Sequence, residues 1–184
     1  MNYTLKEIKS CSATAENPDA LSGQGGKANN GRKGCPCVEP LAAGVTKTLL
    51  HKLGSGTIRK IWCTIPPEHP EHLRNLILRM YWDGQGIPSV EVPLGDFFGI
   101  AHGRQKNMVT PYVGMQDAKG FNCFIPMPFQ KEVMISIEND SETDVDMFFY
   151  QIDFTLGDTH DENTGYFHAQ FRRENPCEIK KDYT

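Results

Sequence analysis

Two stretches of the sequence alternate apolar and polar side chains with a period of two, and this pattern restricts the fold more than any other feature. In the first stretch, Val133, Ile135 and Ile137 fall on one side of an extended chain, and Ser136 and Glu138 fall on the other. In the second stretch, Phe148, Tyr150, Ile152 and Phe154 oppose Gln151, Asp153 and Thr155. Successive side chains of a strand point to opposite faces, so each stretch predicts a strand with one face on a core and one face in solvent.

Glycine and proline punctuate the rest of the chain, with 17 glycines and 12 prolines. Such frequent turn residues suit many short strands better than a helical bundle. One helical turn is expected over Glu71–Asn75, and further strands are expected over Val45–Leu50, Thr57–Ile65, Leu76–Trp82 and Tyr166–Arg173. The sequence therefore predicts an all-β fold, a single jelly-roll β-sandwich of about eight antiparallel strands.

An N-terminal segment, residues 1–40, is expected to precede the jelly-roll part of this single domain, residues 41–184. The segment is rich in glycine and asparagine, notably over Gly23–Gly26 and Asn29–Gly34, and both residue types tolerate a positive φ. A loop of this length is uncommon in a compact domain, so it is either disordered or functional.

The distribution of charge and apolar residues argues against two classes of partner. The 19 basic and 23 acidic residues are scattered, the net charge is −4, and no basic stripe interleaves with aromatic residues, which argues against nucleic acid. No apolar run is long enough to span a bilayer, so no membrane partner is expected. Residues 1–6 lack the apolar core of a signal peptide, which favours a cytoplasmic location unless a leader has been removed.

The six cysteines are expected to be free thiols, because a chain of this length can bury a sufficient core without disulfides. Neither Cys35-Pro36-Cys37 nor the pair His69 and His72 has further ligands at the spacing of a zinc site, so no metal ligand is assigned. The sequence contains no Walker loop, dinucleotide fingerprint or Gly-x-Ser-x-Gly elbow, and no cofactor is expected.

Four blocks of the sequence resemble the DUF2961 family, which includes glycoside hydrolase family 172. The blocks are Leu78–Gly84, Pro88–Gly99, Asn122–Phe129 and Gly165–Glu174. The resemblance implies a jelly roll and a furanoside ligand, because this group acts on fructofuranosides and arabinofuranosides. It also implies that the chain corresponds to the first of two tandem jelly rolls, in a family whose members assemble as trimers with sugar sites near subunit interfaces.

The catalytic part of the family pattern is missing from this chain. The two catalytic glutamates of the family lie in second-roll blocks that resemble Trp-Gly-Glu-Gly-Asp and Gly-Thr-Glu-Asp-Tyr-Phe, and neither block occurs here. The nearest analogue is Leu94–Phe98, in which Gly95 stands at the place of the glutamate. Glycosidases generally need two carboxyl groups that flank the scissile bond, so a lone chain is expected to be catalytically incomplete. Asp96, in the same apolar block, is the candidate catalytic residue.

Planar amides, carboxylates and guanidinium groups are the side chains that bind sugar hydroxyls. On this basis the candidate substrate-binding residues are Asn29, Asn30, Arg32, Asp83, His102 and Arg104. Each has a simpler interpretation as well: the Asn29–Gly34 stretch as a flexible surface loop, Asp83 as part of an Asp-Gly turn, and His102 as a surface histidine. Trp62 and Trp82 could stack on a sugar ring, but their apolar neighbours favour the core for both.

Two functions stay open at this point. The chain is either a furanoside-specific glycoside hydrolase domain that is complete only with a second roll or a partner chain, or a non-catalytic module that binds carbohydrate or self-assembles. If tandem rolls form a trimer with pseudo-sixfold symmetry, single rolls would form a hexamer, so a homo-oligomer, trimer or hexamer, is expected. Such an interface would reconcile the two functions if Asp96 of one chain met polar loop residues of its neighbour.

Overall fold

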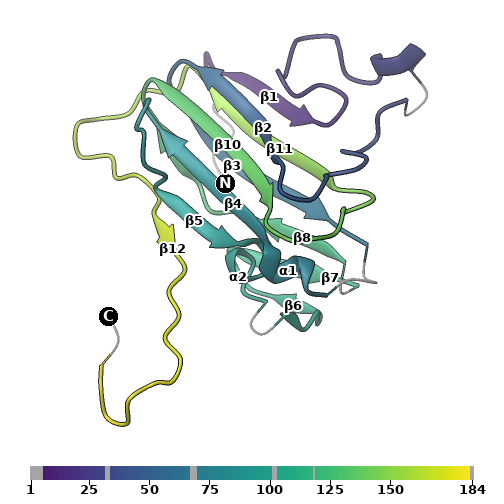
Figure 1. Cartoon of the computed structure of the whole chain (residues 1–184). Coiled ribbons are helices and arrows are strands. Elements are labelled where there is room, and N and C mark those ends of the chain that lie inside the picture. Colours follow the sequence, from purple (N-terminus) through teal and green to yellow (C-terminus); the bar gives the residue numbers. More distant parts are fainter. Residues whose placement is uncertain (1–5, 32–33, 67–69, 101–102, 118, 183–184) are drawn as a thin grey trace.

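The computed structural model describes residues 6–31, 34–66, 70–100, 103–117 and 119–182, and these residues form a sandwich of two β-sheets (Figure 1). The strands are β1 (Lys9–Thr14), β2 (Thr46–Leu53), β3 (Gly56–Thr64), β4 (Leu76–Trp82), β5 (Val90–Pro93), β6 (Met108–Val109), β7 (Val113–Gln116), β8 (Gly120–Cys123), β9 (Met127–Phe129), β10 (Glu132–Asn139), β11 (Phe149–Leu156) and β12 (Ala169–Gln170). The helices are single turns: the 3₁₀ turn η1 (Ala28–Asn30), α1 (His72–Asn75) and α2 (Leu94–Phe97).

The strand order mixes segments that are distant in the sequence. One sheet has seven strands in the order β1-β11-β3-β8-β7-β6, with β9 also paired to β3, and the other has five in the order β12-β5-β4-β10-β2. The chain crosses between the sheets at seven connections: β1 to β2, β2 to β3, β3 to β4, β5 to β6, β9 to β10, β10 to β11 and β11 to β12. All pairings are antiparallel except that of β12 with β5. This arrangement confirms the predicted all-β jelly-roll sandwich.

The core lies between the two sheets and follows the predicted alternation. In β10, Val133, Ile135 and Ile137 are fully buried, and in β11 the same holds for Ile152, with Tyr150 and Phe154 nearly so. The polar residues of β11 point outward, as predicted for a strand with one solvent face.

The two tryptophans differ in position. Trp82 is 1% exposed, and its indole N–H donates a hydrogen bond to the Phe167 carbonyl oxygen at 2.8 Å, which confirms its predicted place in the core. Trp62 is half-buried on the outer side of the seven-stranded sheet, where it pairs with Gln151 and Asn122.

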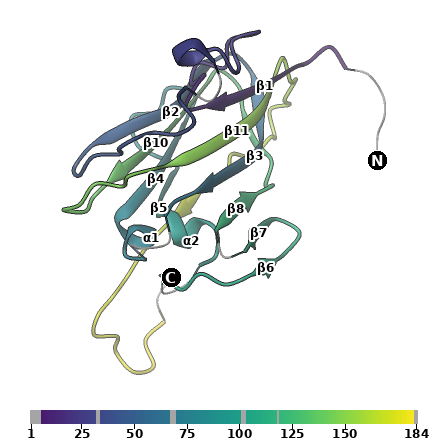
Figure 2. The ribbon, with the colours of Figure 1, turned by 90° about the vertical axis from the view of Figure 1, so that its right-hand side faces the viewer.

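The C-terminal segment departs from its predicted form. The expected strand over Tyr166–Arg173 is reduced to the two residues of β12, which form a parallel edge with Val90 and Glu91 of β5. Beyond β12 the backbone leaves the body of the sandwich, as the yellow trace in both ribbon views shows (Figures 1 and 2), and it has no strand to pair with there. Alternation of side chains alone therefore overestimated this strand, because a strand also needs a hydrogen-bonded neighbour.

The N-terminal segment supplies a strand to the sandwich. β1 lies at the edge of the seven-stranded sheet and pairs over its full length with β11. The predicted helical turn after the proline-rich stretch is confirmed as α1, which packs beside α2 at one end of the sandwich. All six cysteines are free thiols, as expected. No helix in the described ranges is long and apolar enough to cross a membrane.

Candidate functional site

Asp83 follows β4 in a tight turn and acts as a hydrogen-bonding hub. Its φ is 55°, a conformation that Asp adopts more readily than most residues. Its Oδ1 accepts backbone N–H bonds from Gln130, Lys131 and Glu132 at 2.9, 2.7 and 3.1 Å, and its Oδ2 accepts the Tyr166 hydroxyl at 2.5 Å. This carboxylate therefore ties the turn after β4 to the β9–β10 turn and to the C-terminal segment.

The electrostatics of the Asp83 cluster keep its carboxylate ionised. Partial burial acts to raise the pKa of Asp83, but the Tyr166 hydroxyl and the three backbone N–H groups outweigh burial and lower it. The same hydrogen bond, followed by burial, raises the pKa of Tyr166 to about 12. Because four donors already bind the Asp83 carboxylate, its role in the described structure is to hold these segments together.

Asp96 lies in α2 beside the cationic side chain of Arg74, which in turn contacts an aromatic ring. Its Oδ2 is 3.3 Å from Nε of Arg74, and the Asp96 side chain is 21% exposed. The guanidinium of Arg74 stands over the Phe171 ring, 5.1 Å from its centroid. The contact between Arg74 and Asp96 is an ion pair rather than a well-aligned hydrogen bond, since Oδ2 has no hydrogen-bond partner among the described residues. The catalytic role of Asp96 stays a prediction.

Gly95, for which the sequence comparison suggested the place of a family glutamate, has little room for a side chain. A Cβ at this position would lie 3.0 Å from both the Cβ and the carbonyl oxygen of Leu73 in α1. The close packing of α1 against α2 thus depends on glycine at this point. A carboxylate side chain could be placed here only if the two helical turns moved apart.

Asn29 is the predicted residue that lines a polar pocket. The pocket measures about 380 Å³ and lies between the N-terminal segment and the sandwich. Asn29 adopts a left-handed conformation in η1, with φ 47°, and its Nδ2 donates to the Gly34 carbonyl oxygen at 2.8 Å. The neighbouring Asn30 is also left-handed and is exposed, and Arg32 lies outside the described residues.

The same pocket contains residues that were not predicted for the site. Glu39, Lys47 and Tyr150 line it together with Asn29, Cys35 and Cys37. Burial first, and then the nearby Glu39 carboxylate, raises the pKa of the Cys37 thiol, so this thiol stays protonated at neutral pH. The Tyr150 hydroxyl donates a hydrogen bond to the Leu49 carbonyl oxygen at 3.1 Å, so this hydroxyl is already engaged within the protein.

Arg104 lines a second pocket, of about 500 Å³, in the chain that follows α2. Lys106 and Asn107 stand beside it, and Gly99, Ile100, Met108 and Met115 complete the lining. His102, predicted for the same region, lies outside the described residues. The predicted Asn29 and Arg104 therefore belong to two different pockets.

Glu132 lines a third, smaller hollow of about 160 Å³ with Tyr81, Gln85 and Met134. His51 Nε2 lies 2.5 Å from Oε1 of Glu132, across the β2–β10 pairing. Two further carboxylates of the five-stranded sheet, Glu91 and Glu138, bind the guanidinium of Arg79 at 2.7 and 2.5 Å.

Counting only residues that the structure describes, each of the three pockets has at most one carboxyl group in its lining: Glu39 in the first, none in the second and Glu132 in the third. Glycoside hydrolysis requires one protonated and one ionised carboxyl group on opposite sides of the bond. Within the described ranges, no three His, Cys, Asp or Glu side chains are grouped as metal ligands either.

Sequence reasoning missed Glu39, and a weak signal was present. Glu39 stands in a proline-rich stretch directly after the glycine- and asparagine-rich segment, so it was a polar residue beside a suspected binding loop. The contact between His51 and Glu132 had no such signal, because 81 positions separate the two residues and only strand pairing brings them together.

Comparison with known families gives one match. A model of the GH172 domain-like family matches residues 38–152, which is more than half of the chain and extends from the edge of the first pocket to the middle of β11. A search among curated proteins finds no match to the sequence.

Proposed function

Because the chain belongs to the GH172 domain-like family, we propose that it binds a furanoside and that its catalytic site is completed between copies of the chain. Membership makes it a glycoside hydrolase-like, carbohydrate-active protein. The furanoside specificity and the shared site go further than membership, and they rest on the pocket chemistry and on the positions of the carboxylates.

The pocket lined by Asn29, Glu39 and Lys47 supports sugar binding. It offers an amide, a carboxylate and an ammonium group within one hollow of about 380 Å³, which is enough for one or two sugar rings. The Asn29 amide can donate hydrogen bonds to vicinal hydroxyls or accept them, the Glu39 carboxylate can accept them, and Tyr150 contributes an aromatic side chain to the lining.

The observation that carries the proposal is the single carboxyl group of this pocket. Among the described residues of its lining Glu39 is the one acidic residue, so this lining can bind a sugar but does not supply the second carboxyl group that hydrolysis needs. The predicted carboxyl group, Asp96, lies away from this pocket: both ribbon views place η1 on the side of the edge strand β1 and α2 on the side of β5 and β6 (Figures 1 and 2). A site that uses both carboxyl groups therefore requires two copies.

Exposed apolar residues support an association surface on the five-stranded sheet. Leu53 at the end of β2 is 70% exposed, and Ile87 in the loop after β4 is 77% exposed. Both lie at the end where β10 begins, because Leu53 pairs with Glu132 and the turn at Asp83 bonds to the same residue. Apolar side chains this exposed are stabilised when a partner covers them. We propose a homo-oligomer, trimer or hexamer, that uses such contacts.

Complementation between two inactive variants tests the shared site. Glu39→Gln and Asp96→Asn are each expected to lower hydrolysis of an aryl arabinofuranoside or fructofuranoside by at least about 100-fold, because each removes one carboxyl group. Coexpression of the two variants would restore about a quarter of the wild-type sites, since a site shared by two chains can receive both native residues. Glu142→Gln, an exposed carboxylate outside the three pockets, is the matched control and should keep wild-type activity.

The result of coexpression separates the possibilities. Restored activity supports a shared site. If the coexpressed variants stay inactive, then either both carboxyl groups act within one chain or one of them takes no part in catalysis, and the shared site is contradicted. Light scattering on the same samples measures the oligomer, and a monomer with wild-type activity contradicts the proposal.

One observation favours the second candidate function, a non-catalytic carbohydrate-binding module. The tight packing of Gly95 against Leu73 disfavours a carboxylate side chain in the block of this chain that resembles a catalytic block of the family. If the wild-type chain is oligomeric, binds a furanoside in a calorimetric titration and hydrolyses none, this module is the correct description. Binding that is lost in Glu39→Gln would then identify the same pocket without catalysis.

A further inference from the structure

We propose that the pocket behind α2, lined by Arg104 and Lys106, binds an organic ligand through an oxyanion group, that is, a phosphate, sulfate or carboxylate. The proposal is independent of the sugar pocket and assigns a second ligand to the chain. It rests on the charges at the rim of the pocket, on the apolar surface beneath them and on the place of the pocket in the fold.

The rim of this pocket carries two uncompensated positive charges. Neither Arg104 nor Lys106 forms an ion pair with any residue in the described part of the chain, and no carboxylate is found in the pocket lining. The three arginines of the sandwich behave differently: Arg59, Arg74 and Arg79 each lie within 3.3 Å of an Asp or Glu oxygen. In a chain whose net charge is −4, two adjacent cations that form no ion pair with a described residue offer a place for an external anion.

The floor of the pocket is apolar and closely packed. Ile100 and Met115 are 3% and 2% exposed, and Met108 lies between the rim and the floor. Gly99 has φ 77°, and a Cβ there would lie 3.2 Å from the terminal methyl carbon of Met108, so the absence of a side chain keeps this part of the lining open. A floor of this kind suits an apolar ring or the carbon face of a sugar, which explains why we infer an organic anion rather than a free inorganic ion.

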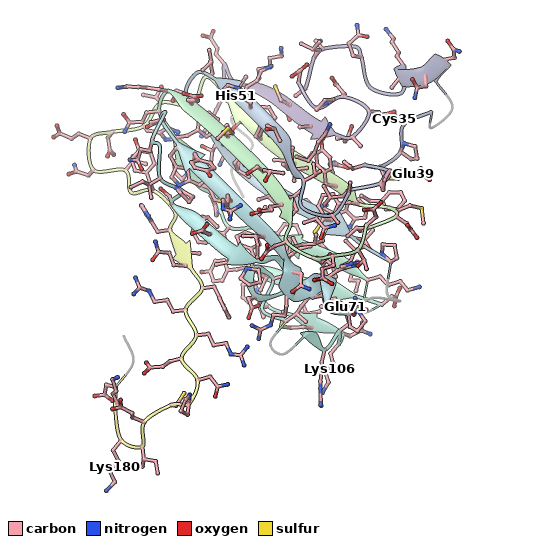
Figure 3. All side chains as sticks on the ribbon, viewed as in Figure 1. Cys35, Glu39, His51, Glu71, Lys106 and Lys180 are labelled. Atoms are coloured by element: carbon pink, nitrogen blue, oxygen red, sulfur yellow. The ribbon has the colours of Figure 1, made fainter. Side chains whose placement is uncertain are left out.

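The pocket is well separated from the proposed sugar pocket of the same copy. Figure 3 shows Lys106 at the lower edge of the molecule and Cys35 and Glu39 on its upper right. A single small ligand cannot reach both pockets, so occupancy of one can be measured without the other.

Titration of the full chain with matched probes tests the proposal. We expect phenyl phosphate to bind at least about tenfold more tightly than inorganic phosphate, because its ring adds contact with the methionine floor, and we expect phenol not to bind. Glucuronate and phenyl sulfate, in separate titrations, show whether the preferred head group is a carboxylate, a sulfate or a phosphate. Added salt should weaken the binding, since the rim charges are exposed.

The variants assign the binding to this pocket. Arg104→Gln and Lys106→Gln are each expected to weaken phenyl phosphate binding by about tenfold, as expected for the loss of a charge-assisted hydrogen bond. The double variant Arg173→Gln with Lys180→Gln removes two positive charges from the exposed C-terminal segment, one more than either rim variant, and should leave the affinity unchanged.

Three outcomes would overturn the proposal. The first is that none of the organic anions binds at millimolar concentration. The second is that the rim variants and the C-terminal control lose affinity equally. The third is that inorganic phosphate binds as tightly as phenyl phosphate. Glu39→Gln separates this proposal from the previous one: unchanged anion affinity in this variant supports two pockets, and a loss places the anion in the sugar pocket instead.

Discussion

The hydroxyl of Tyr166 donates a hydrogen bond of 2.5 Å to Oδ2 of Asp83, and this bond joins two residues that are 83 positions apart. Tyr166 belongs to the segment that precedes β12, and Asp83 directly follows β4. The bond attaches the C-terminal segment to the sandwich at the turn where Asp83 also collects three backbone N–H groups. A residue that the sequence presents as a turn or sugar ligand thus fixes the path of the last described segment.

Removal of this carboxylate is expected to destabilise the fold. Asp83→Asn keeps a residue that tolerates the positive φ, but its uncharged amide is a weaker acceptor for the three N–H groups. We expect the free energy of unfolding to fall by about 1–3 kcal/mol, measured by urea denaturation. Tyr166→Phe should cost about 1 kcal/mol. The loss in the double variant should be smaller than the sum of the two, and strict additivity would contradict the coupling of the two side chains.

The pH dependence of stability provides a second prediction for the same pair. The pKa of Asp83 is lowered in the folded chain, so its contribution is complete above its ordinary pKa of 3.8 and is lost as pH falls through the lower folded value. The pKa of Tyr166 is raised from 10 to about 12, so its contribution is complete below pH 10 and is lost as pH rises toward 12.

The comparison between wild type and Tyr166→Phe isolates these effects from the other carboxylates. We expect the difference in unfolding free energy to be constant from about pH 5 to pH 9, and to shrink below pH 4 and above pH 10. Urea midpoints measured across this range test it. A difference that does not vary with pH would show that the hydrogen bond does not perturb either group.

The sequence predicts the longer strands because these carry enough residues for a period of two. β4, β10 and β11 have seven or eight residues each, and the apolar faces predicted for β10 and β11 are buried. The strands from β5 to β9 have two to four residues, too few for alternation to be recognised. β1 consists of small and polar residues, and its identity as a strand depends on pairing with β11 rather than on its own pattern.

The candidate site was less predictable, because it depends on contacts between distant segments. Asn29 and Arg104 were selected by residue type, and both line pockets, but the sequence gives no indication that these pockets are different. The partners of Asp83 could not be predicted at all, since they come from the β9–β10 turn and from the C-terminal segment. Residue chemistry can be recognised locally, whereas a site is defined by the pairing of strands.

Substitution of Gly95 by alanine tests whether close packing against Leu73 or helix propensity has the larger effect on stability at this position. In an unstrained helical position, Gly→Ala stabilises by up to about 1 kcal/mol. Here the added Cβ would lie 3.0 Å from two atoms of Leu73, so we expect Gly95→Ala to lower the unfolding free energy by about 1–3 kcal/mol. Gly86→Ala is the control, because its Cβ would meet nothing within 4 Å, and it should change stability by less than about 0.5 kcal/mol. Equal effects at both positions would show that α1 yields easily.

The reactivity of the cysteines provides the last prediction. Cys177 is exposed, whereas Cys63 and Cys123 are buried in the core, and burial raises the pKa of both core thiols. Alkylation requires an accessible thiolate, so iodoacetamide should label Cys177 at least about 100-fold faster than Cys63 or Cys123 in the native chain. Mass spectrometry of the digested protein measures each rate, and Cys177→Ser should remove the fast phase. After unfolding in urea all six positions should react, because all six are free thiols; a cysteine that reacts only after reduction would reveal a disulfide and contradict this assignment.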